Sequence, residues 1–344
     1  MKNTILLLLL LFIPVLLHSQ NTELLKLQFE ARVDYMHESQ AGNIINPNSG
    51  FKGKYLNILM DGNLTENLSY SYRQRLNKPC SEASLFDATD WITVTYTASN
   101  WSFSAGKQVV GIGGFEYDGA PIDLYFCSEF WNNIPCYQFG TSVTYTTDDK
   151  EDRFMLQFCE SPFRRNVHNT SNREMFAYNA MWCSSHGIFS SLYSVNMMEY
   201  LPGKFINYIA LGNQLKFSDV TIKLDLMNRA LSLKDFIGKD MSVMGEIAWQ
   251  PAEWINIFAR MSYDVNKSSR EGDWCVTPGT DILRLGGGLE FFPVRNYHNF
   301  RIHLNGCHTT GSSAPAGVLR NNQTIFDAGV TWKVNMLNIK RKQN

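Results

Sequence analysis

The sequence has almost no net charge, because 31 lysines and arginines are balanced by 32 aspartates and glutamates. Nucleic-acid-binding domains carry a marked excess of cations, so this balance excludes nucleic acid as a partner. Long hydrophobic runs are also lacking after residue 17, since every later window of about eighteen residues contains charges or turn-forming residues. The sequence therefore predicts no transmembrane helix beyond its first residues.

Metal and catalytic motifs are missing as well. The seven cysteines are an odd number and include no Cys-x-x-Cys, so neither zinc ligation nor any other metal site is predicted. No histidine belongs to a His-x-x-x-His pair, and there is no nucleophile elbow, phosphate loop or dinucleotide fingerprint. His303 is interpreted as an ordinary residue of a strand. The sequence thus predicts no enzyme and no cofactor.

The first residues have the features of an export signal. After Lys2 the chain is uncharged from Ile5 to Leu17 and then reaches the polar residues His18, Ser19 and Gln20. One cation, a short apolar core and a small residue are typical of a secretory signal peptide, and the core is too short to span a membrane as a helix. We therefore predict a signal peptide over residues 1–19 and a mature domain over residues 20–344.

The mature region is rich in aromatic residues, which make up 13% of the chain, and its apolar residues alternate with polar ones. Period-two alternation is typical of β-strands with one apolar face. Sixteen candidate strands of about ten residues each follow, which is the length that a tilted strand needs to cross a bilayer. They begin near Leu25, Lys54, Asn67, Trp91, Trp101, Tyr137, Arg153, Met175, Ile188, Phe205, Val220, Met241, Trp254, Ile282, Asn299 and Thr324.

The connections between these strands alternate in length. Short turns such as 61–66, 98–100 and 147–152 alternate with mostly longer loops such as 77–90 and 111–136, and only the connection through Pro202 is intermediate. Short turns at one end and long loops at the other are typical of outer-membrane barrels, whose turns face the periplasm. The sequence therefore predicts an all-β, transmembrane antiparallel barrel of about 16 strands in the bacterial outer membrane, in contact with outer-membrane lipid.

The alternation also predicts which side chains face lipid. In the first strand Leu27, Phe29 and Val33 lie on one face and Arg32 and Asp34 on the other. We expect the apolar face to contact lipid and the charged face to line a watery lumen. The cations predicted to face the lumen are Lys26, Arg32, Arg73, Arg75, Arg153, Lys223, Arg260, Arg284, Arg301 and Lys333, and the acids are Glu30, Asp34, Asp225, Glu246, Asp264, Glu290 and Asp327.

Aromatic residues gather at strand ends, where amphipathic rings prefer the lipid headgroup zone. These rings predict two girdles, although ordinary sheet packing is an alternative explanation. They are Tyr35, Trp91, Trp101, Tyr145, Trp182, Trp249, Trp254, Tyr263, Phe291 and Trp332.

The sequence resembles the phosphate-selective porin O and P family in the form found in Bacteroidetes outer membranes. The residues that carry the resemblance are the signal peptide, Ser104–Gln108 leading into Phe115–Pro121, Leu224–Arg229, Gly287–Pro293 and Phe326–Val334. The resemblance implies a sixteen-stranded barrel, usually a homotrimer, in which the third long loop folds into the lumen. That loop is the segment 111–136.

The segment 111–136 is predicted to form the pore constriction. It is rich in glycine and aromatic residues, and it contains Glu116, Asp118, Asp123 and Glu129 but neither lysine nor arginine. If these acids face Arg73 and Arg75 on a nearby wall, a transverse field arises that favours small polar solutes over lipophilic ones. A dedicated phosphate channel would need a cationic constriction instead. Cys127 and Cys136 could close the loop with a disulfide, or could be small apolar packing residues.

Three functions are compatible with these features. The first is a passive diffusion channel for small hydrophilic solutes, which can include anions such as phosphate. The second is a barrel plugged by its loops that serves as a structural or docking subunit of an outer-membrane assembly. The third is a soluble exported β-protein. Conductance of the purified protein separates the first two, and partition into detergent separates both from the third.

Overall fold

The computed structural model describes residues 23–78, 85–165, 174–232, 237–268, 271–313, 318–319 and 322–340. The predicted signal peptide and Cys80 lie outside the described residues. Among the described residues, no helix is long and apolar enough to cross a membrane.

Sixteen long antiparallel strands form a closed barrel, as predicted, because the first strand pairs with the last. Two further strands, β2 (Asn43–Ile44) and β17 (Val318–Leu319), are two-residue pairings within loops. The long strands are β1 (Glu23–Gln40), β3 (Gly50–Asn63), β4 (Leu68–Arg75), β5 (Thr89–Ala98), β6 (Trp101–Val109), β7 (Tyr137–Thr146), β8 (Asp152–Glu160), β9 (Phe176–His186), β10 (Phe189–Leu201), β11 (Lys204–Phe217), β12 (Val220–Ala230), β13 (Asp240–Ala252), β14 (Ile255–Asn266), β15 (Asp281–Phe291), β16 (Phe300–Ser313) and β18 (Gln323–Lys340).

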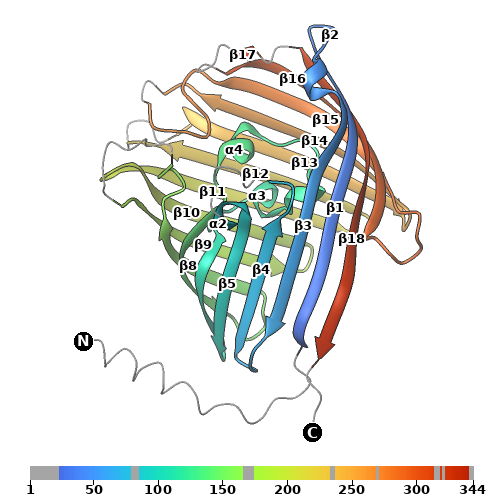
Figure 1. Cartoon of the computed structure of the whole chain (residues 1–344). Coiled ribbons are helices and arrows are strands. Elements are labelled where there is room, and N and C mark those ends of the chain that lie inside the picture. The colour runs from blue at the N-terminus through green and yellow to red at the C-terminus, as the bar shows by residue number, and fades with distance from the viewer. Residues whose placement is uncertain are drawn as a thin grey trace.

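The predicted strand starts agree with the structure to within four residues, the largest difference being Lys54 against Gly50 at the start of β3. All the short turns except that between β10 and β11 lie at one end of the barrel, which we call the turn end, where both ends of the described chain also lie (Figure 1). The opposite end, the loop end, carries the longer connections. The connection at Pro202, predicted to be of intermediate length, consists only of Pro202 and Gly203 and joins β10 to β11 at the loop end.

The faces of the strands follow the predicted alternation. Leu224 exposes 52% of its surface on the outside, whereas Arg32 and Arg260 are buried at 2% and 8% exposure. Exposed Val33 and Tyr35 flank buried Asp34 on β1 in the same way. This distribution is the reverse of a soluble barrel, in which the apolar face fills the interior, and it suits a barrel surrounded by lipid.

Aromatic rings gather at the turn end, which agrees with one of the two predicted girdles. Trp101 packs against Tyr145 at 5.0 Å between ring centroids, and Trp254 against Phe291 at 5.9 Å. Trp91 is an exception, because its indole donates a hydrogen bond to Ser71 and its ring lies beside the guanidinium of Arg73. Its prediction as a girdle residue is wrong.

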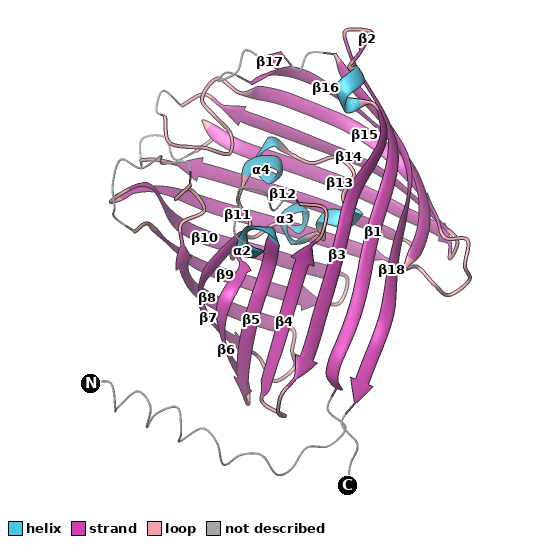
Figure 2. Ribbon diagram, in the orientation of Figure 1, coloured by secondary structure: helices cyan, strands magenta, loops and turns pink. Residues whose placement is uncertain are grey.

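The helical turns of the chain are short, and most of them lie inside the ring of strands (Figure 2). The β6–β7 connection, residues 110–136, contains α3 (Phe115–Asp118), η2 (Pro121–Asp123) and α4 (Glu129–Asn133), and we call it the inner loop. Two further helices, η1 (Asn46–Asn48) and α2 (Leu85–Ala88), lie in the first two connections at the loop end.

The apolar core of the molecule lies inside the barrel, where the inner loop meets the wall. Phe130 of α4 is fully buried, with its ring 6.0 Å from Tyr117 and 5.9 Å from Tyr208 of β11. Ile112 and Ile134 belong to the same cluster. Of the two alternatives for Cys127 and Cys136, the disulfide is wrong, because both are free thiols, and the packing interpretation fits their position in or against this core.

Candidate functional site

The glycines that open the inner loop place its backbone directly on the wall. A Cβ atom on Gly113 would lie 2.6 Å from the carbonyl oxygen of Leu192, so only glycine fits there. The Gly113 amide donates to Ser194 Oγ at 2.8 Å, and the Gly111 amide donates to Gln157 Oε1 at 2.8 Å. Polar side chains of β8 and β10 therefore replace the strand hydrogen bonds that the loop lacks.

Glu116 is the centre of the first attachment. Its carboxylate accepts from the amide of Ser128 at 3.0 Å and from the Ser128 hydroxyl, which links α3 to the N-terminus of α4. The same carboxylate pairs with Arg260 of β14 at 2.6 Å, and both side chains are buried. In turn, the Glu116 amide donates to Asp225 of β12 at 2.7 Å.

Glu129 forms the second attachment, one strand further along the wall. Its carboxylate pairs with Arg284 of β15, and its amide donates to Asp264 of β14 at 2.8 Å. A wall cation thus holds the loop carboxylate, while a wall carboxylate holds the start of the helix. Such mutual pairing compensates the cost of burying charges.

Asp123 forms the third attachment, with Arg301 of β16 at 2.6 Å and Lys333 of β18 at 2.8 Å. Burial alone would raise the pKa of the Asp123 carboxyl, but the two cations lower it below its ordinary value. Next to it, the hydroxyl of Tyr125 donates to Glu290 at 2.6 Å and accepts from Arg301 at 3.1 Å.

Arg32 of β1 completes the attachment. It donates to the carbonyl oxygen of Leu124 at 2.7 Å and lies 4.5 Å from the centre of the Tyr125 ring. Arg32 also pairs with Asp34 and Asp327. We call the inner faces of β12 to β16, β18 and β1 the anchoring wall, because they hold residues 116–129 of the loop.

The predicted field between the loop acids and Arg73 and Arg75 is not what the structure contains. The carboxylate of Asp90, at the start of β5, pairs with Arg73 at 3.3 Å and Arg75 at 2.8 Å. Of the four loop acids, Glu116, Asp123 and Glu129 pair with the anchoring wall. Among the described residues, only Asp118 of these four is exposed and outside any ion pair.

Two predicted wall cations lie nearer the turn end. Lys223 of β12 pairs with Glu246 of β13 at 2.7 Å, and Lys26 of β1 lies opposite Asp61 of β3. Lys223 lines a cavity of about 530 Å³ beneath the inner loop. Lys26 is half-buried at the same end of the barrel.

A second cavity, of about 790 Å³, lies above the inner loop at the loop end. Its lining contains more cations than acids. The cations are Arg75, Lys78, Lys107, Arg164 and Arg165, and the acids are Asp87, Asp90 and Glu160. The upper cavity touches Pro121 and the lower one touches Ala120 and Asp123, so this part of the loop lies between the two.

The wall across from the attachments has a different chemistry. Inward positions of β4 to β7 carry small hydroxyl side chains, several of which bond to one another, as Thr95 does to Ser104 at 2.8 Å. All are half-buried, so they retain some contact with solvent inside the barrel. We call this set the hydroxyl wall, and it consists of Ser69, Ser71, Thr93, Thr95, Ser102, Ser104, Ser142 and Thr144.

Sequence reasoning missed several cations and the acid that matter at the loop end. Lys78, Arg164 and Arg165 lie just beyond strand ends, where alternation assigns no face. Asp90 was missed because the predicted strand begins at Trp91, one residue after Asp90. A strand predicted from Thr89, where β5 begins, would have included Asp90.

Comparison with known proteins agrees with this architecture. The family model described as phosphate-selective porin O and P matches residues 25–188, which confirms the resemblance seen in the sequence. No curated relative matches the chain.

Solved structures share the fold at low sequence identity. OmpT of Vibrio cholerae in a trimer form is similar with a TM-score of 0.58 and 10% identity, over 91% of this chain and 100% of that one. An anion-selective porin from Comamonas acidovorans is similar with a TM-score of 0.61 and 10% identity, over 90% of this chain and 99% of that one. The outer membrane channel DcaP of Acinetobacter baumannii is similar with a TM-score of 0.63 and 9% identity, over 90% of this chain and 96% of that one.

Proposed function

We propose that this chain, an outer-membrane barrel whose residues 25–188 belong to the phosphate-selective porin O and P family, is a passive diffusion channel for small hydrophilic solutes. The observation that carries the proposal is the attachment of residues 116–129 of the inner loop to one side of the barrel only. The loop acids are bound to the anchoring wall, while the hydroxyl wall stays in contact with solvent. A loop held in this way narrows the lumen without filling it.

Within this channel, solutes are selected by size and by charge. The cations that exceed the acids around the upper cavity favour the entry of anions. Glu116, Asp123 and Glu129 do not oppose this preference, because wall cations neutralise them. The name of the anion-selective relative from Comamonas acidovorans agrees with an anion preference.

The constriction residues then divide into two groups. Arg75 and Asp118 act on passing solute, since Arg75 lines the upper cavity and Asp118 is exposed. Arg73 is buried and shares the carboxylate of Asp90 with Arg75, so it helps to position Arg75. Glu116, Asp123 and Glu129 fix the position of the loop instead. Passage of solute needs no cofactor in this account.

A homotrimer is the assembly that we propose. The family resemblance implies it, and OmpT of Vibrio cholerae is described in a trimer form. Cross-linking of the purified protein in detergent, followed by gel electrophoresis, tests this assembly.

Single-channel recording in planar bilayers tests the proposed function. We expect ohmic steps from the pure protein and, in a salt gradient, a reversal potential with the sign of anion preference. A reversal potential of the opposite sign would contradict the anion preference alone. Absence of steps from folded protein would contradict the channel and favour the plugged barrel.

A further inference from the structure

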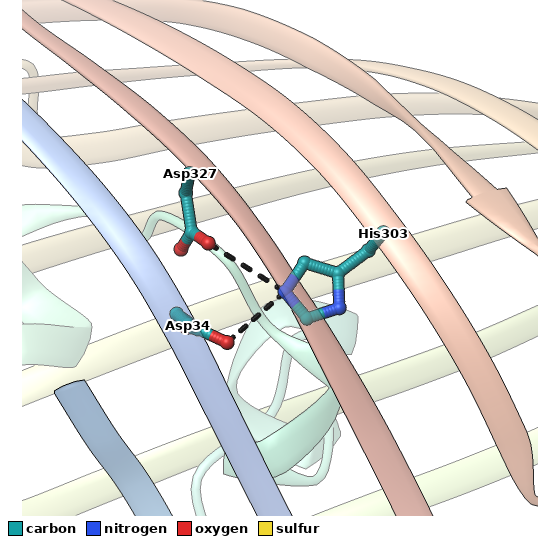
Figure 3. Close-up of side chains that lie close together, drawn as sticks. All are labelled: Asp34, His303 and Asp327. Carbon is teal, nitrogen blue, oxygen red and sulfur yellow. Dashed lines mark hydrogen bonds and ion pairs between the residues drawn. The ribbon is translucent and has the colours of Figure 1, made fainter. Parts of the chain in front are cut away.

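Three ligand-type side chains of the anchoring wall converge on one point (Figure 3). His303 Nε2 of β16 lies 3.1 Å from Oδ1 of Asp34 on β1 and 3.5 Å from Oδ1 of Asp327 on β18. All three side chains are almost fully buried, with at most 3% exposure. Imidazole nitrogen and carboxylate oxygen are ligands that Zn²⁺ and related divalent ions prefer.

The barrel is built to allow this convergence. In the strand register, His303 lies opposite Gly329 of β18, and Gly329 lies opposite Asp34. A Cβ atom on residue 329 would lie 2.4 Å from Asp34 Oδ1 and 2.7 Å from His303 Nε2. Only glycine at this position lets the histidine reach across the intervening strand to the carboxylate.

Hydrogen bonding alone does not account for the arrangement. A single N–H on Nε2 can point at only one of the two oxygens, and Asp327 Oδ1 has no hydrogen-bond donor, although it is buried. An ion between the three atoms binds both oxygens and the nitrogen at once. Ligand atoms about 2.0 to 2.2 Å from a tetrahedral ion are themselves roughly 3.3 to 3.6 Å apart, close to the separations seen here.

Arg32 contacts the two carboxylates of this cluster. It pairs with Asp34 Oδ2 at 2.7 Å and Asp327 Oδ2 at 3.1 Å, and its Nε donates to Asp34 Oδ1 at 3.0 Å. The Oδ1 atoms of both carboxylates face His303 Nε2. Groups that orient metal-bound carboxylates in this way are usual around metal sites. The Leu124 carbonyl and the Tyr125 ring, which both contact Arg32, offset the excess positive charge that an ion would bring.

We infer that Asp34, His303 and Asp327 bind a divalent transition-metal ion of the Zn²⁺ type. The ion joins β16, β18 and β1, the strands at which the two ends of the chain meet to close the barrel. It also fixes the position of His303, against which Tyr125 of the inner loop packs, since the ring centroids of Tyr125 and His303 are 4.7 Å apart. Metal binding therefore stabilises the closing seam and the attachment of the inner loop.

The test uses the full-length protein, folded in detergent and freed of metal with a chelator. We expect the wild type to bind one equivalent of Zn²⁺, to give the visible absorption of tetrahedral Co²⁺, and to melt at a higher temperature with Zn²⁺ than with chelator. His303→Gln and Asp327→Asn should weaken Zn²⁺ binding at least roughly tenfold. His308→Gln is the matched control, because His308 is exposed on the same strand.

Two results would overturn the inference. One is a wild type without stoichiometric Zn²⁺ or Co²⁺ binding, a measurement that requires no variant to fold. The other is binding by Asp327→Asn as tight as in the wild type, which would place the ion elsewhere. Neither result bears on conductance, so the proposed channel is tested separately.

Discussion

The anchoring wall and the hydroxyl wall have the same strand geometry but opposite relations to the inner loop. On the anchoring wall, Arg260, Arg284 and Arg301 each take one loop carboxylate. On the hydroxyl wall, side chains such as Thr95 and Ser104 bond to each other, and in the described part of the chain no hydrogen bond joins this wall's hydroxyl groups to the loop. The comparison teaches that the side-chain chemistry of the wall decides on which side the loop rests.

This asymmetry has a physical reason. A charged carboxylate loses its hydration when it is buried, and only a cation with hydrogen bonds restores that energy. The loop contains acids but no cation of its own, so its carboxylates must lie against the wall that provides cations. Hydroxyl groups are hydrated at little cost, and a wall of this kind suits the passage of water and small solutes.

Removing the loop would break the comparison most strongly. Deletion of residues 113–133 takes away the segment between the upper and lower cavities. We expect a several-fold rise in single-channel conductance, because both walls then line the pore. A wild type without conductance and a conducting deletion variant would instead identify the loop as a plug.

Glu116→Gln weakens the attachment at its centre. The variant leaves the buried guanidinium of Arg260 with Glu246 alone, at 3.4 Å, and removing one partner of a buried pair costs about 3 kcal/mol. We expect this loss in the free energy of unfolding by urea, together with noisier single-channel current. Glu66→Gln, at an exposed turn, should change neither quantity.

Opposite changes in selectivity sharpen the comparison further. Arg75→Gln removes a cation from the upper cavity and should lower the anion-to-cation permeability ratio by roughly twofold. Asp118→Asn removes the exposed loop acid and should raise the same ratio by a similar factor. Reversal potentials in a salt gradient measure both, and shifts of the same sign would count against the assigned positions of these charges.

Lowering the pH is expected to have the smallest effect on conductance. Because the pKa of Asp123 is lowered, its bonds to Arg301 and Lys333 contribute their full stability at pH values above the ordinary pKa of a carboxyl group. This stability is lost only as the pH falls through the lowered pKa. Conductance should therefore change little between pH 7 and about pH 4. In Lys333→Met, which removes one of the two cations, we expect a change to begin at higher pH.

Sequence alone predicted the wall far better than the loop. Alternation with a period of two placed Arg32, Arg260 and Arg284 inside and Leu224 outside, because each strand position has only two faces. The inner loop has no period, and its partners depend on how far it crosses the lumen. The pairing of Glu116 with Arg260 could therefore not be predicted.

The cluster in Figure 3 shows the same limit. Asp34 and His303 are 269 positions apart in the chain and meet only because the last strand pairs with the first. His303 was interpreted as an ordinary wall residue, since no ligand lies near it in sequence. The signal that could have found the cluster was the inward position of all three residues together with Gly329 in the strand between two of them.

The central claim, that solute passes the inner loop on the side of the hydroxyl wall and not on the side of the anchoring wall, is tested most directly by cysteine accessibility. Ser104→Cys lies on the half-buried hydroxyl wall, and Ser262→Cys on the buried anchoring wall. A charged, membrane-impermeant thiol reagent should reduce the conductance of Ser104→Cys and leave Ser262→Cys and the wild type unchanged. Loss of conductance in Ser262→Cys with none in Ser104→Cys would contradict the account.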